Sequence, residues 1–237
     1  MTAPRTRVFL FDVDGTLVHA GGAGRRAFER AVVDFCGPLD GALAGLRLDG
    51  MTDRLIVRES LAILGRPFEE AFCDRILARY VEHLTTEVHG PGYRVLPGVV
   101  AALERLRARG DVLGLCTGNV VEGARLKLSR GGLDGFFDWD ASAVCGFAHD
   151  GEERERLVLA ALARAAARLG HPFDPREALV IGDTPRDVAA AHHAGVPVLA
   201  VATGHYSVEE LRACGADHAV PTLEDPAAAR LLGAAPA

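Results

Sequence analysis

Two carboxylates near the start of the chain, Asp12 and Asp14, stand one residue apart. They follow an apolar run at positions 8–11 whose β-branched and aromatic residues predict a buried strand. Because side chains at i and i+2 of a strand point the same way, both carboxylates should leave the sheet on one side. Two like charges so placed destabilise a fold unless something uses them, and the usual candidate is a divalent cation. Gly15 follows at once and permits a tight turn or the close approach of a ligand.

A second pair of acids follows another apolar run, at positions 178–182. Asp183 comes directly after this predicted strand, and Asp187 lies four residues later at the start of a predicted helix. A negative charge in the first turn of a helix is stabilised by the helix dipole, which is the alternative explanation for Asp187.

A third polar group, Thr117-Gly118-Asn119, ends a predicted strand at positions 112–117. A hydroxyl there, followed by glycine and a helix start, offers one O–H and several backbone N–H groups to an anion. The alternative is that Thr117 only caps the helix that follows. Cys116 precedes this group in an apolar strand, where we expect it to pack rather than to act as a nucleophile.

The elements that must position these groups alternate along the second part of the chain. Strands are predicted at 112–117, 136–144, 178–182 and 197–201, with helices between them. This alternation with short links predicts a parallel sheet covered on both faces. Such a sheet places every strand's carboxyl end along one edge, where ligands bind, so the three polar groups should meet there.

The stretch from Gly24 to about Pro91 is different, because its pattern is helical with no convincing strand. Glycines and prolines at 90–92 and 96–98 then mark the return to the alternating composition. We therefore predict an α/β fold with a Rossmann-like core formed by residues 1–20 and 92–237. An inserted, small, all-helical domain is predicted at 21–91.

Composition limits the partners and the location. The chain has 237 residues, of which 49% are hydrophobic, and a formal net charge of −6 without a basic run, so nucleic acid and membrane surfaces are not expected partners. No apolar segment approaches the roughly 20 residues of a membrane span, and the N-terminus lacks a signal-peptide core. Five scattered cysteines without C-x-x-C predict reduced thiols, a cytoplasmic location and no zinc site. A monomer and a homodimer are both compatible with the sequence.

The run from Phe11 to Leu17 resembles motif I of the haloacid dehalogenase (HAD) superfamily in its phosphatase-type form. Thr117 resembles motif II, and Gly182-Asp183 with Asp187 resembles motif IV. The inserted helical block stands where this family has its C1-type cap. Among capped members, the overall pattern is most similar to phosphoglycolate-phosphatase-like enzymes. The resemblance therefore implies the HAD fold and a phosphatase.

The resemblance also implies a role for each matching residue. Asp12 is the nucleophile that forms an aspartyl-phosphate, and Asp14 is the acid and base. Mg²⁺ is held by Asp12, the backbone carbonyl of Asp14 and Asp183, while Asp187 orients the metal's water shell or a neighbouring cation. The transferring phosphoryl group is bound around Thr117, with Gly118, Asn119 and Lys127 as further candidates.

Motif III of the family supplies a cation to the nucleophile and the phosphoryl oxygens, and here three residues compete for this role. Arg154, at the start of the helix before the motif IV strand, is our first choice. Lys127, on the helix after motif II, and Arg156 are alternatives. For each of the three, a solvated surface charge remains the competing explanation.

Motif I also separates sibling activities. A dehalogenase needs no proton donor at the position of Asp14, and a phosphonatase needs a cap lysine, whereas no lysine occurs between residues 1 and 126. We therefore predict a Mg²⁺-dependent phosphatase acting on a small, soluble phosphate monoester. A phosphomutase, which uses both acids, and a non-catalytic phosphate-binding member remain as alternatives.

The cap should contact the part of the substrate beyond the phosphate. A polar, glycine-containing turn at positions 47–54 leads into a cap helix, and Thr52, Asp53 and Arg54 are the candidate specificity residues. The alternative is a plain turn with Thr52 as a helix cap.

Overall fold

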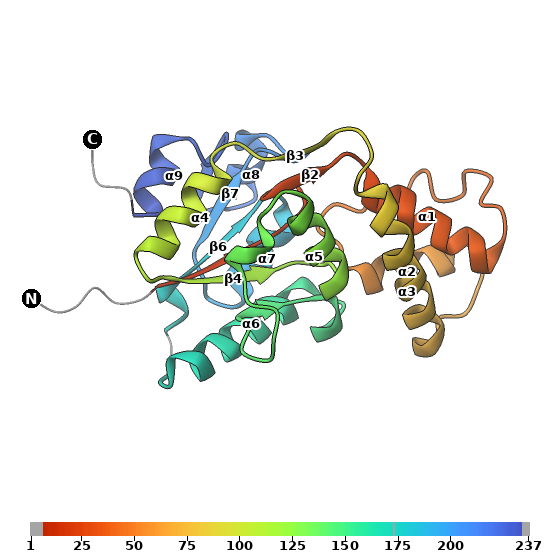
Figure 1. Ribbon diagram of the computed structural model, residues 1–237, viewed down its shortest axis with the longest axis horizontal. Coiled ribbons are helices and arrows are strands. Elements are labelled where there is room, and N and C mark those ends of the chain that lie inside the picture. The colour runs from red at the N-terminus through yellow and green to blue at the C-terminus, as the bar shows by residue number, and fades with distance from the viewer. Residues whose placement is uncertain (1–6, 173, 234–237) are drawn as a thin grey trace, which may run out of the picture.

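The computed structural model describes residues 7–172 and 174–233. Residues 1–6 and 234–237, the two ends of the predicted core domain, lie outside the described residues. Figure 1 shows a sheet flanked by helices, with three further helices at the opposite end from the two termini. These three are α1 (Ala23–Cys36), α2 (Asp53–Ile63) and α3 (Glu70–Glu87).

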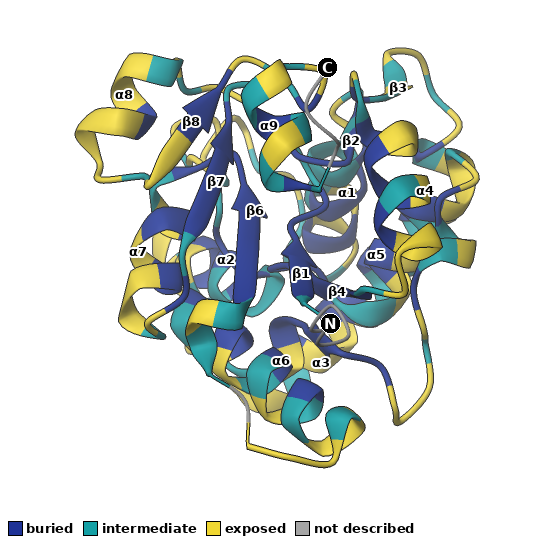
Figure 2. Ribbon diagram, turned by 90° about the vertical axis from the view of Figure 1, so that its left-hand side faces the viewer, coloured by how far each residue is buried: buried dark blue, intermediate teal, exposed yellow. Residues whose placement is uncertain are grey.

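The sheet has six parallel strands in the order β5-β4-β1-β6-β7-β8. The central strand β1 is wholly buried, as its apolar sequence predicts (Figure 2). It lies between β4 and β6, so that Phe11 pairs with both Leu115 and Ile181. The bounds are β1 (Val8–Phe11), β4 (Val112–Cys116), β5 (Cys145–Gly146), β6 (Ala178–Gly182), β7 (Val198–Val201) and β8 (His218–Val220).

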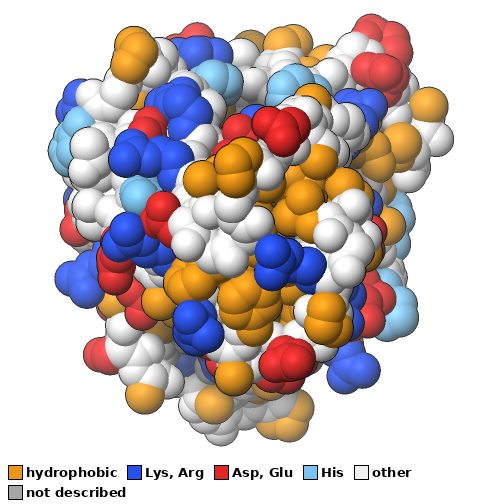
Figure 3. All heavy atoms as spheres, turned by 90° about the vertical axis from the view of Figure 1, so that its right-hand side faces the viewer, with side chains coloured by type: hydrophobic (Ala, Val, Ile, Leu, Met, Phe, Trp, Pro, Cys, Tyr) orange, Lys and Arg blue, Asp and Glu red, His pale blue; other side chains and the backbone are white. Residues whose placement is uncertain are grey.

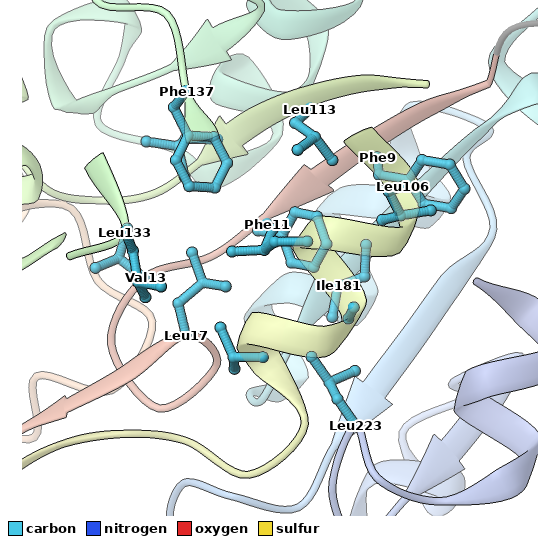
Figure 4. Packing of buried hydrophobic residues seen from close by; sticks show 14 of the residues in the cluster. Phe9, Phe11, Val13, Leu17, Leu106, Leu113, Leu133, Phe137, Ile181 and Leu223 are labelled. Carbon is cyan, nitrogen blue, oxygen red and sulfur yellow. The ribbon is translucent and has the colours of Figure 1, made fainter. Parts of the chain in front are cut away.

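Alternating side chains of β1 divide the core between the two faces of the sheet. Phe9 and Phe11 pack with α4 (Val99–Ala108), α5 (Val121–Arg130) and α9 (Pro226–Leu231), as the close view in Figure 4 shows in part. Val8 and Leu10 pack on the other side, with α6 (Arg154–Leu169), α7 (Pro185–His193) and α8 (Val208–Ala213). The predicted α/β class with a parallel sheet covered on both faces is confirmed.

The prediction of a strand at 136–144 is wrong. The chain forms a 3₁₀ helix at Asp134–Phe136, and the strand β5 begins only at Cys145. Polar groups explain the difference, because one carboxylate oxygen of Asp140 accepts hydrogen bonds from the backbone N–H of Ser142 (2.8 Å) and from its hydroxyl (2.6 Å). A side chain that bonds the backbone two residues on favours a turn over a strand.

The helices α1, α2 and α3 share a hydrophobic cluster of their own, which includes Phe28, Val57, Ile76 and Tyr80. Two short antiparallel strands, β2 (Val18–Ala20) and β3 (Tyr93–Val95), connect these helices to the sheet. The predicted boundaries at residues 20/21 and 91/92 fall next to these strands. We call residues 21–91 the cap.

The outer face of the cap is partly apolar. Figure 3 shows hydrophobic side chains gathered on this end of the molecule, with charged side chains around them. Within the described ranges, none of the helices is both long and apolar enough to cross a membrane.

Candidate active site

Three neighbouring strands bring the chemistry-bearing residues to one edge of the sheet. Asp12 follows β1, Thr117 follows β4 and Asp183 follows β6, and β1 pairs with both of its neighbours. The backbone N–H of Asp12 continues the pairing by donating to the carbonyl of Ile181 at 2.9 Å. All three polar side chains are buried. Parallel pairing therefore assembles, from distant parts of the chain, the group that the sequence motifs predict.

Asp12, Asp183 and Asp187 each offer a carboxylate oxygen, and these oxygens lie within 4.8 Å of one another. Burial raises the pKa of Asp12 to about 6, although the charge of Arg154 opposes the shift. Burial and the charge of Asp12 also raise the pKa of Asp183 well above its usual range. A bound cation would favour the ionised form of these crowded carboxylates. All of the donor atoms are oxygens, which are the ligands that Mg²⁺ prefers. These residues therefore fit a divalent metal.

Glycines make room for the Asp183 carboxylate. Gly15 has a φ of +82°, and a Cβ there would lie 2.2 Å from Oδ2 of Asp183. A Cβ at Gly204 would lie 1.9 Å from the same oxygen. The hydroxyl of Thr16 donates to Oδ1 of Asp183 at 3.0 Å. The glycine after the two acids of motif I is thus required by both its backbone conformation and the carboxylate packed against it.

Arg154 lies between two of the acids. It is the first residue of α6 and is buried, so the alternative of a solvated surface charge does not describe it. Its Nη2 lies 2.8 Å from Oδ1 of Asp12, and its Nε donates to Oδ1 of Asp187 at 2.7 Å. Asp187 also caps α7 together with Thr184, so it serves the helix terminus and Arg154 at once. Arg156, the sequence alternative, is exposed.

Lys127 contacts the other acid of motif I. Its Nζ lies 2.6 Å from Oδ2 of Asp14 and 2.6 Å from Oδ1 of Asn119. Asn119 donates in turn to Asp14 at 2.9 Å and to Oγ1 of Thr117 at 2.7 Å. Burial alone would lower the pKa of Lys127, but the negative charge of Asp14, together with Tyr80 and Asp53, raises it. Lys127 is the only lysine in the sequence, and it is buried.

These groups line one end of a cavity of about 780 Å³ between the sheet edge and the cap. Of the predicted site residues, the cavity is lined by Asp12, Asp14, Asp53, Thr117, Gly118, Asn119, Lys127, Arg154 and Asp183. Asp187 lies behind Arg154 and is not part of the lining.

The three predicted cap residues have different environments. Asp53 lines the cavity, and its Oδ2 accepts the N–H of Val120 at 2.7 Å, while burial raises its pKa to about 6. Thr52 is the N-cap of α2 and donates to the carbonyl of Glu152 at 3.0 Å, so it joins the cap to the core. Arg54 points away from the cavity and pairs with Glu70 and Asp74 on the cap surface. Neither Thr52 nor Arg54 lines the cavity.

Several lining residues were not singled out from the sequence. Asp49 of the cap loop lies 2.6 Å from Nδ1 of His205, which follows β7, and Arg47 pairs with the same carboxylate. Tyr80 of α3, which packs in the cap's hydrophobic cluster, also lines the cavity. The polar turn at 47–54 carried a usable signal for Asp49. For His205 no signal existed, because only the order of strands in the sheet brings this loop beside the cap.

The family model of haloacid dehalogenase-like hydrolases matches residues 9–192. The chain belongs to this family, as the run from Phe11 to Leu17 indicated. The prediction of a phosphatase-type hydrolase is confirmed as well, because relatives of known name are phosphatases.

Two curated relatives and one solved structure illustrate the likeness. The chain is 35% identical to a phosphoglycolate phosphatase of Rhodospirillum rubrum over 215 residues, which cover 89% of this chain and 85% of that protein. It is 30% identical to a protein of Dickeya dadantii named "Probable phosphatase IndB", with 91% and 90% covered. The crystal structure of a hydrolase from Pseudomonas syringae shares the fold, with a TM-score of 0.71 and 23% identity, covering 97% of this chain and all of that one.

Proposed function

We propose that this protein hydrolyses a small phosphate monoester with Mg²⁺, through an aspartyl-phosphate on Asp12. The observation that carries the proposal is the position of Asp12. Its carboxylate lies at the end of a cavity, paired with Arg154 and grouped with Asp183, while Asp14 projects beside it from the same strand end. Names of the relatives, several of which are phosphoglycolate phosphatases, support a phosphate ester as the substrate.

The chemistry needs these residue types, because uncatalysed hydrolysis of phosphate monoesters is among the slowest of biological reactions. A carboxylate oxygen of Asp12 attacks phosphorus, and the bond from phosphorus to the ester oxygen breaks. Asp14 gives its proton to the departing alcohol oxygen. It then accepts a proton from water as that water attacks the aspartyl-phosphate, which releases inorganic phosphate and restores Asp12.

Four acids and one arginine have distinct proposed roles around the metal. Asp12, the backbone carbonyl of Asp14 and Asp183 would hold Mg²⁺, which when bound supplies the positive charge that lets a carboxylate approach a phosphate. Asp187 holds Arg154 by two of its guanidinium nitrogens. Arg154 is thereby kept beside Asp12, where it can neutralise the nucleophile and the phosphoryl oxygens as the motif III cation.

The remaining polar groups bind phosphate or hold the acid. Thr117 and Gly118 line the same cavity as Asp12, and we assign the Thr117 hydroxyl and the Gly118 backbone N–H to binding the phosphoryl oxygens. Asn119 and Lys127 bond Asp14 directly, so we assign them the task of orienting this acid. This assignment replaces phosphate binding as the main role of Lys127.

An acid-quench experiment tests the proposal. The protein is mixed with Mg²⁺ and a ³²P-labelled phosphate ester, quenched in acid and digested, and the labelled peptide is identified. We expect label on the peptide containing Asp12, and release of phosphate without any sugar acceptor, which also excludes the phosphomutase alternative. Absence of phosphate release over a broad ester panel, or label on another residue, would contradict the proposal.

A further inference from the structure

The cavity is large for a small acid. Its volume of about 780 Å³ lies within the range of roughly 300–1,000 Å³ that is typical of sites for ligands of drug size. A two-carbon leaving group at the Asp12 end would leave most of this space filled with water. The volume therefore favours a leaving group larger than glycolate.

The cap contributes an apolar surface to the cavity, beside polar side chains of the same cap segments. Three separate segments of the cap contribute to it, from α1, the loop before α2, and α2 itself. Phe28, Met51 and Ile56 are buried in the cap cluster, and Leu48 is partly buried against it. Ala44 and Leu46 extend the same lining. Burying apolar substrate surface against an apolar wall strengthens binding, whereas burying a carboxylate there does not.

The cations near the reacting end already have partners. Arg154 pairs with Asp12 and Asp187, and Lys127 pairs with Asp14. Arg25, from the cap, pairs with Glu29 and donates to backbone carbonyls of the cap loop. A substrate carboxylate would have to displace one of these bonds, at the cost of leaving a charge unpaired.

Two more arginines line the cavity at its margin. The side chain of Arg47 is 73% exposed and is paired with Asp49. Arg94, on β3, is exposed as well. Exposed guanidinium groups give only weak, solvent-screened attraction to an anion. Arg47 and Arg94 therefore do not form a buried binding site for a substrate carboxylate.

From these contacts we infer that the leaving group of the natural substrate is an uncharged alcohol with an apolar or aromatic part that packs on Leu48, Met51 and Ile56. The inference rests on the proposed function and narrows its substrate class. It departs from phosphoglycolate, whose leaving group is a small anion.

Three esters of primary alcohols test the inference: 2-phosphoglycolate, ethyl phosphate and 2-phenylethyl phosphate. Comparing ethyl phosphate with phosphoglycolate tests the effect of the carboxylate charge, and comparing it with the phenylethyl ester tests the effect of apolar size. With Mg²⁺, we expect kcat/KM for the phenylethyl ester to exceed that for phosphoglycolate by about 10-fold or more, which is the range that apolar contacts in a pocket provide. A kcat/KM for phosphoglycolate equal to or above that for the phenylethyl ester would overturn the inference and leave the phosphatase proposal intact. Failure of the wild-type protein to hydrolyse any of the three would instead contradict the proposed function.

Substitution of the cap wall supplies the second half of the test. Leu48→Lys should lower kcat/KM for the phenylethyl ester about 10-fold and raise it for phosphoglycolate. Leu48→Ala, which is milder should the lysine disturb the cap, should lower kcat/KM for the phenylethyl ester about 3-fold and lower that for ethyl phosphate less, because a two-carbon chain offers less apolar surface to the wall. Leu159→Lys is the matched control, because Leu159 is exposed on α6 and does not line the cavity. Equal changes for all three esters in the Leu48 variants would overturn the inference.

Discussion

At the scale of single residues, the site is a set of close charges, mostly buried, in which four carboxylates outnumber two cations. Asp12 and Asp187 share Arg154, Asp14 has Lys127, and Asp183 has a hydroxyl but no cation of its own among the described side chains. Removing one member therefore affects both the chemistry and the energy of its neighbours.

Asp12→Asn should reduce phosphate release by at least about 10³-fold, because an amide cannot act as the nucleophile. The substitution removes a carboxylate whose charged form is disfavoured by burial, so the midpoint of thermal unfolding at pH 8 should not fall. Phosphate release and a thermal melt of the same sample measure both effects. Turnover at the parental rate would exclude Asp12 as the nucleophile.

Arg154→Ala leaves two buried carboxylates without their cation. We expect the free energy of unfolding in EDTA to drop by about 3–5 kcal/mol, and turnover with Mg²⁺ to drop by about 100-fold or more. Arg156→Ala, at an exposed position on the same helix, should stay within about 0.5 kcal/mol of the parent. Urea unfolding and steady-state kinetics distinguish them. If both variants behave alike, Arg154 is not the motif III cation.

Asp53 gives stability a pH dependence of known sign. Its pKa rises from 3.8 in the unfolded chain to about 6 in the fold, because burial disfavours the charged form. Between about pH 4 and pH 6, the folded state therefore binds more protons at Asp53 than the unfolded chain does. The contribution of Asp53 to the free energy of unfolding falls as pH rises through that window. Asp53→Asn escapes the penalty and keeps an acceptor for Val120. Its stability relative to the parent should increase by about 1–3 kcal/mol from pH 4 to pH 7, measured by urea unfolding in EDTA. A constant difference over this range would contradict the assignment.

At the scale of elements, the cap loop and the start of α2 hold the cap on the core. The hydroxyl of Thr52 donates to the carbonyl of Glu152. The backbone N–H of Asp53 donates to the carbonyl of Gly118, and the Asp53 carboxylate accepts the N–H of Val120. Arg58 of α2 adds a two-bond ion pair with Glu152. The cap side of the cavity is therefore held in place by contacts within a few residues of the first turn of α2.

Arg54 occupies this turn but lies on its outer side. Arg54→Ala should change kcat/KM by less than about 2-fold for every ester in the panel described above, because its partners Glu70 and Asp74 are exposed cap residues. The loss in stability should be about 1 kcal/mol or less. A selective loss for one ester, seen in steady-state kinetics, would show that Arg54 contacts the substrate after all.

At the scale of the whole molecule, metal binding should stabilise the entire fold. Three carboxylates converge from loops after β1 and β6 and from α7, so a cation bound there links parts of the chain that are far apart in sequence. A ligand that binds only the folded state, at 100 times its Kd, adds about 2.7 kcal/mol to the free energy of unfolding. For a chain of this size, that corresponds to roughly 5–10 °C in Tm.

Thermal unfolding in Mg²⁺ and in EDTA measures this effect. EDTA should also abolish phosphate release. Asp183→Asn should lose the Tm difference, whereas Asp138→Asn, which changes an acid paired with Arg168 away from the cluster, should keep it. The metal assignment fails if the parent melts at the same temperature in both solutions.

What the sequence determined by itself was the local chemistry and the order of elements. Apolar runs ending in Asp12, Thr117 and Asp183 specified three buried strands, and the parallel arrangement put their ends together, because side chains and strand ends follow simple periodicities. The strand expected at 136–144 failed, because hydrogen bonds of Asp140 within its own turn outweigh a weak apolar pattern.

Only the tertiary structure decided how the charges pair and what lines the cavity. From the sequence, Arg154 was the first choice for the motif III cation, with Lys127 and Arg156 as alternatives. The fold separated them by burying Arg154 against Asp12 and Lys127 against Asp14. It also turned Arg54 outward and brought His205 to Asp49. Such contacts depend on helix rotation and on the order of strands in the sheet. Neither is encoded in the spacing of residues along one segment, because both result from packing between segments that are distant in the chain.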